Sequence, residues 1–157
     1  MLVAIDTSVL VAGIIAAHAS HVPAKQWLDA IDRRDFDAIV CTHALAELYA
    51  VLTRIPGGLS PAEAQVTVSN LPNRMRVVPL TAGAYVAAIE RCSTRALKSG
   101  VIFDALHLVA AERSGAVALL TFNPSDFTRL VQADSPKIVV PSAPPAEVMA
   151  TISSPNV

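Results

Sequence analysis

The sequence predicts an α/β fold, a three-layer α/β/α sandwich with a central parallel sheet of four to five strands. Short, continuous apolar runs recur along the chain and alternate with longer segments of helical character. Such runs are typical of parallel strands buried on both faces, and their alternation with helices gives a sheet covered on each side. With 157 residues, 53% of them hydrophobic, the chain can bury the core of a single domain.

One strand and two helices are expected at the start of the chain. Residues 2–5 are a continuous apolar run that ends at Asp6, as expected of a buried strand. The apolar segment 9–17 is most easily a buried helix. Pro23 then opens a more amphipathic helix, because proline is favoured in the first turn, and its apolar positions extend to Ile31.

The next segment predicts a strand and two helices. Residues 38–41 form the second strand, and Thr42 is placed to cap a helix from about residue 43 to residue 54. Residues 60–63 then supply a helix start signal, in which serine is the cap, proline the first helical residue and glutamate the partner in a capping box. We expect that helix to end near Asn70.

Two further strands and two helices follow. The third strand is expected at residues 76–80, where a proline ends it, and a helix from about residue 84 to residue 95 comes next. A break at residues 99–100 precedes a helix that runs to residues 114–115. Residues 116–121 are again continuously apolar up to the final threonine and predict the fourth strand.

The last strand is expected at residues 137–141, and it completes the sheet. We place the domain at residues 1–140. The remaining residues, 141–157, are rich in proline and serine. We expect them to form a loosely ordered C-terminal tail with no catalytic role.

The composition limits the classes of function. The formal net charge is −1 and the isoelectric point about 6.4, so any binding of nucleic acid must be local or depend on a metal. Cys41 and Cys92 form no metal-binding pattern, which favours reduced thiols and a cytoplasmic protein. We expect neither a secretory signal nor a membrane span, and the sequence has no glycine-rich phosphate-binding loop.

Four acids stand in settings that suggest a shared site. Asp104 lies in an otherwise apolar helical segment, where a carboxylate is rare unless it is paired or binds a metal. Asp6 ends the first strand and Asp126 follows the fourth, while Glu47 lies in the helix after the second. Ligands of open parallel sheets bind beyond the carboxyl ends of the strands, where the strand order reverses. These acids can therefore meet if the first and fourth strands are neighbours.

Each of these acids also has a purely structural explanation. Asp6 could cap the following helix, and Asp126 could cap the short turn at Phe127. Glu47 could be an exposed residue of an amphipathic helix. Asp104 has the weakest alternative of this kind, because apolar residues leave little polar face around it. A shared site explains the placement of the acids together, whereas the structural explanations need separate coincidences.

Clustered oxygen ligands without cysteine or histidine favour Mg²⁺ or Mn²⁺. Such a metal activates a bound water and orients it for hydrolysis of a phosphodiester bond. Thr121 and Asn123 follow the fourth strand and Ser8 follows the first, so these side chains are expected to line the site. His107 falls one turn after Asp104 and is either a neighbour of the site or a packed helix histidine.

Several basic or metal-binding side chains are weaker candidates. Arg91, Arg95 and Lys98 lie just ahead of the helix with the buried acid and could touch the backbone of RNA, although a solvated face explains them as well. His18 and His21 have an i, i+3 spacing, but two surface histidines are a better explanation than a zinc site.

Four segments together resemble the PIN domain in order and approximate spacing, and more narrowly the VapC toxins of toxin–antitoxin pairs. They are residues 6–10, the isolated Glu47, residues 104–110 and residues 121–127, and the match extends over about residues 1–140. The resemblance implies a parallel sheet sandwiched by helices, in agreement with the fold predicted above.

The resemblance also implies roles for individual residues. Asp6, Glu47 and Asp104 correspond to three acids of the metal site in this family. The fourth position is an acid or an asparagine, for which this chain offers Asn123 and Asp126. We favour Asp126, because an amide holds a cation less strongly than a carboxylate does.

The implied activity is that of a Mg²⁺- or Mn²⁺-dependent endoribonuclease, with Ser8 and Thr121 lining the pocket. A homodimer and a small antitoxin that blocks the acidic pocket are implied as partners. One alternative is a PIN-like binding or scaffold subunit with poor affinity for metal because of Asn123. Another is a phosphoacceptor domain, although no lysine follows a late strand in the way that such a domain needs.

Overall fold

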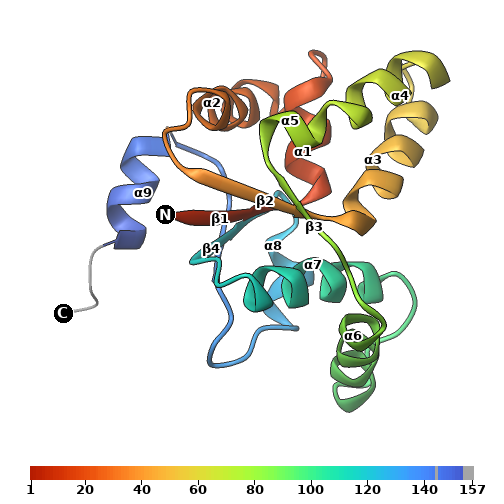
Figure 1. The fold of residues 1–157 in the computed structure, drawn as a ribbon, viewed down its shortest axis with the longest axis vertical. Helices are drawn as coiled ribbons and strands as arrows, with labels where there is room; N and C mark the ends of the chain where they lie inside the picture. Colours follow the sequence, from red (N-terminus) through yellow and green to blue (C-terminus); the bar gives the residue numbers. More distant parts are fainter. Residues whose placement is uncertain (144, 154–157) are drawn as a thin grey trace.

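The computed structural model describes residues 1–143 and 145–153, and it contains a five-stranded sheet in the order β3-β2-β1-β4-β5 (Figure 1). Every pair of neighbouring strands is parallel, which confirms the predicted fold class. The strands are β1 (Leu2–Ile5), β2 (Asp37–Cys41), β3 (Arg76–Val78), β4 (Ala118–Leu120) and β5 (Lys137–Val139).

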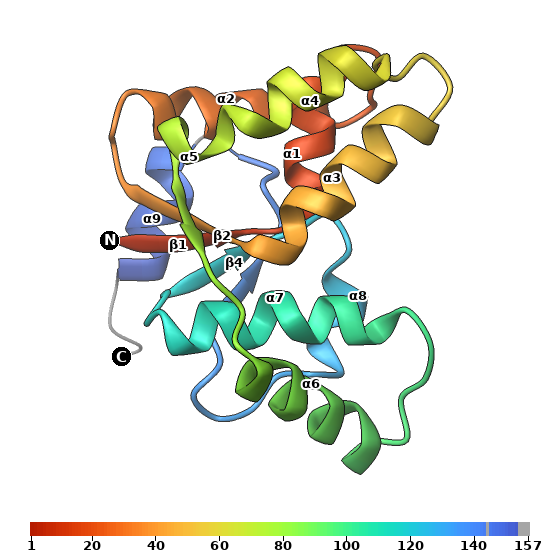
Figure 2. The ribbon, with the colours of Figure 1, turned by 45° about the vertical axis from the view of Figure 1, so that its right-hand side comes forward.

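Helices cover both faces of the sheet, so the molecule has three layers (Figure 2). The first layer packs on one core cluster and consists of α1 (Thr7–Ile14), α2 (His21–Asp32), α3 (Thr42–Arg54), α4 (Pro61–Ser69), α5 (Leu71–Arg74) and α9 (Pro145–Ser153). The opposite layer consists of α6 (Ala82–Thr94), α7 (Val101–Arg113) and α8 (Pro124–Thr128). Across residues 1–143 and 145–153, none of these helices is long and apolar enough to cross a lipid bilayer.

The strands explain why their sequences are apolar without interruption. Val3 and Ile5 of β1 belong to the core cluster under α1 and α2, whereas Ala4 belongs to the cluster under α7. Successive side chains of a strand point to opposite faces, and here both faces are buried. A polar residue at any of these positions would lie in a core.

The strand order reverses at β1, which lies between β2 and β4. Val3 pairs with Ala118 of β4, and the backbone N–H of Asp6 donates to the carbonyl of Leu120 at 2.9 Å. The carboxyl ends of the two strands therefore lie side by side, as the predicted site requires. Asp6 and Thr121 are the residues that follow these ends.

Helix starts show both the strength and the weakness of sequence signals. The capping box of α4 is confirmed, because the Ser60 N–H donates to Glu63 at 2.9 Å and the Glu63 N–H donates to the Ser60 hydroxyl at 3.3 Å. The predicted capping role of Thr42 is wrong. Cys41 occupies the cap position of α3, and the Thr42 hydroxyl accepts the N–H of Leu80 instead. A partner from another part of the chain thus replaced the local one.

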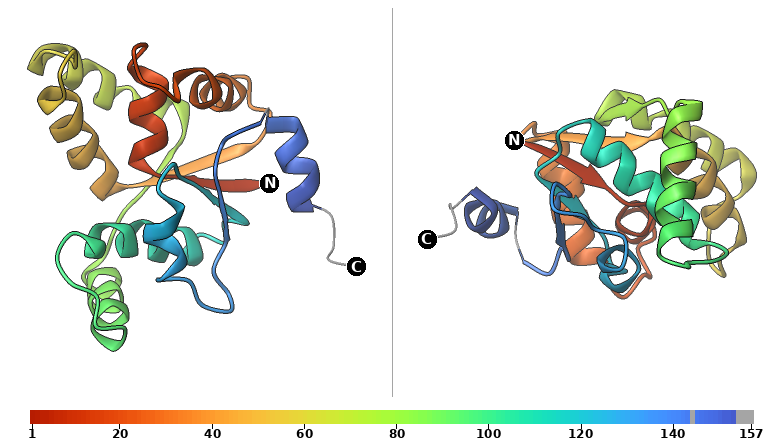
Figure 3. Two further views of the ribbon diagram at one scale, coloured as in Figure 1. Left: turned by 180° about the vertical axis from the view of Figure 1, so that it is seen from behind. Right: turned by 90° about the horizontal axis from the view of Figure 1, so that it is seen from below.

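The prediction of a loosely ordered C-terminal tail is also wrong for the described residues, because α9 is a helix that packs on the core beside α2 and the N-terminus (Figure 3). Val148, Met149 and Ile152 supply its apolar contacts, at helical spacing. The indole N–H of Trp27 donates to the carbonyl of Ala143 at 3.2 Å just before the helix. Residues 144 and 154–157 lie outside the described part, and the boundary at residue 140 stays a prediction.

Candidate active site

A cavity of about 650 Å³ opens at the carboxyl ends of β1 and β4, between α1, α3 and α7. Three of the four predicted acids line it, namely Asp6, Glu47 and Asp104, together with Ser8 and Asn123. The rest of its wall is mainly apolar and includes Val11, Ile15, Val51, Ile55 and Phe122. The cavity thus combines an acidic floor with apolar sides.

Asp6 does not cap α1 with its side chain, although its backbone is at the cap position. The side chain is directed to the site instead, where Oδ2 accepts from the hydroxyls of Ser8 at 2.5 Å and Thr121 at 2.8 Å. These hydroxyls in turn accept the N–H groups of Phe122 at 3.0 Å and Asn123 at 2.9 Å. Because Asp6 is only 5% exposed, these bonds fix its carboxylate in one orientation.

Glu47 faces the same cavity from the second turn of α3. Its Oε2 atom accepts from the Thr7 hydroxyl at 2.7 Å and lies 2.9 Å from Nε2 of His107. Burial raises the pKa of Glu47, but the hydrogen bonds from His107 and Thr7 and the charge of His107 outweigh it and hold that pKa below its ordinary value. Glu47 is therefore ionised at neutral pH and is not a free surface residue.

His107 is only 4% exposed and lies behind the carboxylates. Its Nδ1 atom is 3.6 Å from the sulfur of Cys41, so the ring bridges the end of β2 and Glu47. Burial lowers the pKa of His107, but its hydrogen bonds to Cys41 and Glu47 outweigh that effect and hold the pKa well above its ordinary value. Of the two explanations offered for this histidine, the structure supports the neighbour of the site.

Asp104 occupies the first turn of α7, where the free N–H groups and the helix dipole favour a negative charge. Burial and the charges of Asp6 and Asp126 nevertheless raise its pKa to about 6, and the charge of Glu47 adds to this shift. No lysine or arginine among residues 1–143 and 145–153 forms an ion pair with it. Asp104 is thus an acid without an ion pair to lysine or arginine, and the charge of His107 offsets only part of the rise in its pKa.

Asp126 and Asn123 occupy different places. Asn123 lines the cavity, whereas Asp126, in the first turn of α8, has a side chain that is 41% exposed and lies 2.9 Å from the guanidinium of Arg129. The charge of Asp126 still reaches Asp104, since it raises the pKa of that acid. The choice of Asp126 as fourth ligand stays a prediction.

Residues 3–133 match the PIN domain family. The chain belongs to this family. The ribonuclease VapC27 of Mycobacterium tuberculosis is 31% identical over 117 residues, which cover 73% of this chain and 81% of that protein. The resemblance to VapC-type PIN proteins is therefore confirmed.

Solved structures share the fold of this PIN domain at lower identity. DNA-bound VapBC from Salmonella typhimurium has a TM-score of 0.64 with 17% identity and covers 90% of this chain and 99% of that one. The Mycobacterium tuberculosis toxin VapC20, which cleaves the sarcin–ricin loop, has a TM-score of 0.61 with 22% identity and covers 74% and 86% of the two chains.

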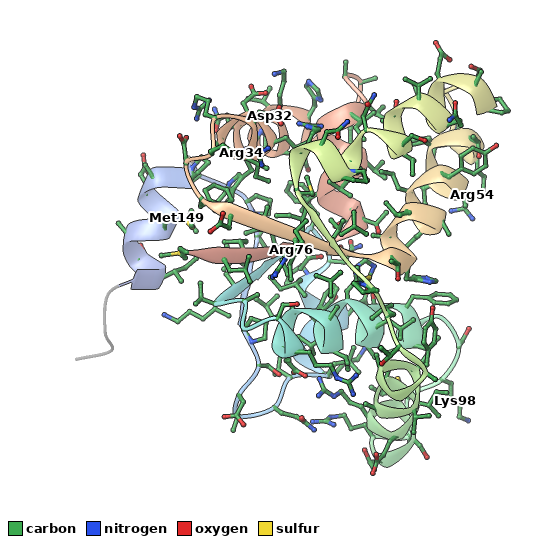
Figure 4. All side chains as sticks on the ribbon, viewed as in Figure 1. Asp32, Arg34, Arg54, Arg76, Lys98 and Met149 are labelled. Atoms are coloured by element: carbon green, nitrogen blue, oxygen red, sulfur yellow. The ribbon has the colours of Figure 1, made fainter. Side chains whose placement is uncertain are left out.

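The three cations predicted to contact RNA are placed differently in this PIN domain. Arg91 is 9% exposed and both its terminal nitrogens contact Glu112 at 2.8 Å, so it is not available to a ligand. The guanidinium of Arg95 donates to the carbonyl of Val131 at 3.1 Å. Lys98 is exposed in the loop after α6 (Figure 4). Arg95 keeps its charge and its other nitrogens and Lys98 is exposed, so these two, unlike Arg91, remain available to a phosphate backbone.

The donor set suits a hard cation. Among the described residues, no three His, Cys, Asp or Glu side chains lie close enough together to hold a metal ion by themselves. Mg²⁺ is usually held by one or two carboxylates, with water and substrate phosphate completing its ligands. The oxygens of Asp6, Glu47 and Asp104 around one cavity fit that kind of ion, and burial together with the charges of the neighbouring acids raises the pKa of Asp104.

Two contacts of the site escaped the sequence analysis. Thr7 belongs to the segment 6–10 of the PIN-like pattern and was assigned no role of its own, yet its hydroxyl binds Glu47, 40 residues away. Cys41 was read as an isolated thiol, yet it contacts His107. Position directly after a strand end was the available signal for Thr7, and Cys41 is the last residue of β2.

Proposed function

We propose that this PIN domain is a metal-dependent endoribonuclease and the toxin of a toxin–antitoxin pair. The observation that carries the proposal is that Asp6, Glu47 and Asp104 line one cavity, while no lysine or arginine among the described residues pairs with Asp104. The name of the relative VapC27, a ribonuclease, supports the same activity.

We assign Asp6, Glu47, Asp104 and Asp126 as the residues that hold Mg²⁺ or Mn²⁺. The first three line the cavity, and Asp126, which does not line it, is included because its charge acts on Asp104. When bound, such an ion lowers the pKa of a water and stabilises charge on the phosphate oxygens during hydrolysis. The excess negative charge of the pocket would otherwise repel RNA. This charge is the reason why the reaction should depend on the ion.

The residues around the acids orient rather than react. Ser8 and Thr121 hold the carboxylate of Asp6 in place and leave little freedom for it to rotate. The side-chain amide of Asn123 can donate to a phosphate oxygen at the mouth of the cavity. No protein nucleophile is required.

We also propose a cytoplasmic location, a homodimer and a small antitoxin that covers the acidic pocket. The solved VapBC complexes, whose toxin chains share this fold, support the antitoxin. A basic side chain from such a partner would pair with Asp104 and relieve the repulsion in the pocket.

A binding subunit without catalysis is the second candidate. The presence of Asn123 rather than a carboxylate in the cavity favours it, because an amide attracts a cation less strongly. Metal uptake separates the two candidates, since a scaffold has no need of the ion.

The decisive experiment incubates a pool of structured RNA with the purified protein in Mg²⁺, Mn²⁺ or EDTA. Asp104→Asn is prepared in parallel, and Asp29→Asn, which changes an exposed acid paired with Lys25 on α2, is the matched control. We expect metal-dependent cutting that Asp104→Asn lowers roughly a hundredfold or more and Asp29→Asn leaves intact. Equal cutting by both variants, or cutting in EDTA, would contradict the proposal.

A further inference from the structure

Two donors converge on a single oxygen of Glu47. The Thr7 hydroxyl from α1 and the His107 ring from α7 both bind Oε2, at 2.7 and 2.9 Å. Within residues 1–143 and 145–153, Oε1 accepts no hydrogen bond. One oxygen of this carboxylate is therefore committed to the protein, while the other is available to a ligand.

His107 can hold Glu47 because it is itself held. The ring is buried, and its second nitrogen lies 3.6 Å from the sulfur of Cys41 at the end of β2. A buried imidazole with both nitrogens engaged cannot turn without losing one of these contacts. Through these two contacts, His107 fixes the position of the Glu47 side chain relative to the sheet.

The restraint matters because of the length of the Glu47 side chain. A glutamate has three rotatable bonds, and this one is 31% exposed in its side chain, so packing alone does not define its position. Asp6, which is shorter and 5% exposed, is likewise held through one oxygen, by the hydroxyls of Ser8 and Thr121. Donors from two helices fix the distal end of Glu47.

We infer that Thr7 and His107 are positioning residues that fix Glu47 through Oε2 and leave Oε1 free for a divalent cation. The inference rests on the proposed function, since it presumes that Glu47 is a metal ligand. His107 is 4% exposed and lies behind the cavity wall, whereas Thr7 is 3% exposed and lies in that wall with its hydroxyl already bound to Glu47. Hydrogen bonds to a ligating side chain typically change metal affinity by roughly 10–100-fold when removed.

The test measures Mn²⁺ affinity by calorimetry, together with thermal unfolding, on matched variants. Thr7→Val removes the hydroxyl at constant shape, and Thr7→Ser restores it. His107→Gln keeps an amide donor near the position of Nε2, whereas His107→Leu does not. Thr42→Val is the control, because it removes a hydroxyl on the same helix as Glu47 that accepts the N–H of Leu80 and has no hydrogen bond to Glu47.

We expect Thr7→Val and His107→Leu each to weaken Mn²⁺ binding roughly tenfold or more, with recovery in Thr7→Ser and partial recovery in His107→Gln. Thr42→Val should lower thermal stability without changing affinity. In a double-mutant cycle, Thr7→Val should have no further effect on Mn²⁺ affinity once Glu47→Gln is present. A purely structural role of Thr7 would give the same loss in both backgrounds.

The outcomes distinguish failure of the positioning role from failure of the proposed function. Wild-type protein that neither binds Mn²⁺ nor cuts RNA would overturn both. Wild-type protein that binds Mn²⁺, with unchanged affinity in Thr7→Val or with losses that persist in the Glu47→Gln background, would overturn the positioning role alone. Should His107→Leu fail to fold, the Thr7 cycle still decides.

Discussion

The two ends of α7 each contain an acid, but only one of these acids forms an ion pair. At its last turn, Glu112 is bound by both terminal nitrogens of Arg91 at 2.8 Å, in a pair whose side chains are 18% and 9% exposed. At its first turn, Asp104 has like charges around it, and its pKa is raised to about 6. The same helix therefore contains one satisfied acid and one unsatisfied acid.

This difference indicates a structural role for Glu112 and a functional role for Asp104. Burying a charge costs free energy unless a partner compensates, and Arg91 supplies that compensation for Glu112. No described side chain forms an ion pair with Asp104, and the charge of His107 offsets only part of the rise in its pKa. An acid that the fold leaves uncompensated at the mouth of a cavity is suited to an external cation.

The largest effect on stability should come from removing the ion pair between Arg91 and Glu112. Arg91→Met leaves Glu112 buried without its cation, and we expect a loss of about 3 kcal/mol in the free energy of unfolding. Lys25→Met, which breaks an exposed pair with Asp29, should cost about 0.5 kcal/mol or less. Urea unfolding measures both. Equal losses would show that the Arg91 pair is as weak as a surface pair.

Removal of the Asp104 charge is expected to change stability in the opposite direction. Because the pKa of Asp104 is raised from 3.8 to about 6, the folded protein binds its proton more tightly than the unfolded chain does. The ionised Asp104 therefore lowers the free energy of unfolding by its full amount above about pH 6, and this destabilisation disappears below about pH 4. Removing the charge should thus stabilise the metal-free protein.

We expect Asp104→Asn to raise the free energy of unfolding by on the order of 1 kcal/mol near pH 7, a figure that allows for screening by solvent. The gain should shrink as the pH falls from about 6 to about 4. Urea unfolding across this range, without metal and with EDTA, measures it. A destabilised variant at neutral pH would assign Asp104 a structural role.

The smallest effect concerns the fourth ligand. We expect Asp126→Asn to weaken Mn²⁺ binding by about threefold to tenfold, and Asn123→Ala to weaken it less, because a charge acts at longer range than an amide. Calorimetry on the two variants measures the order. The reverse order would transfer the ligand role to Asn123, which lines the cavity.

Much of the site followed from strand ends. Asp6 and Thr121 are the first residues after neighbouring strands, so their hydrogen bond follows from the register of a parallel sheet. The buried surroundings of Asp104 were also predictable, because the apolar sequence of α7 has few polar positions. Both inferences depend on spacing within one element or on one pair of strands.

The remaining errors and omissions involve partners that are distant in the sequence. Arg91 was expected at the surface because the sequence shows its charge but not Glu112, which lies 21 residues further on. The Thr42 hydroxyl accepts the N–H of Leu80 instead of capping α3. The C-terminal segment is helical because the apolar residues of α9 pack on the core near Trp27. Such contacts depend on how helices pack, which local patterns do not determine.

The central claim is that the unpaired acid of α7 belongs to a cation site. Its most direct test is a calorimetric titration of Mn²⁺ into the wild-type protein, Asp104→Asn and Glu112→Gln at about pH 7. We predict binding by the wild type and by Glu112→Gln, and at least about tenfold weaker binding by Asp104→Asn. Equal affinity of Asp104→Asn and the wild type, or no binding by the wild type, would contradict the claim.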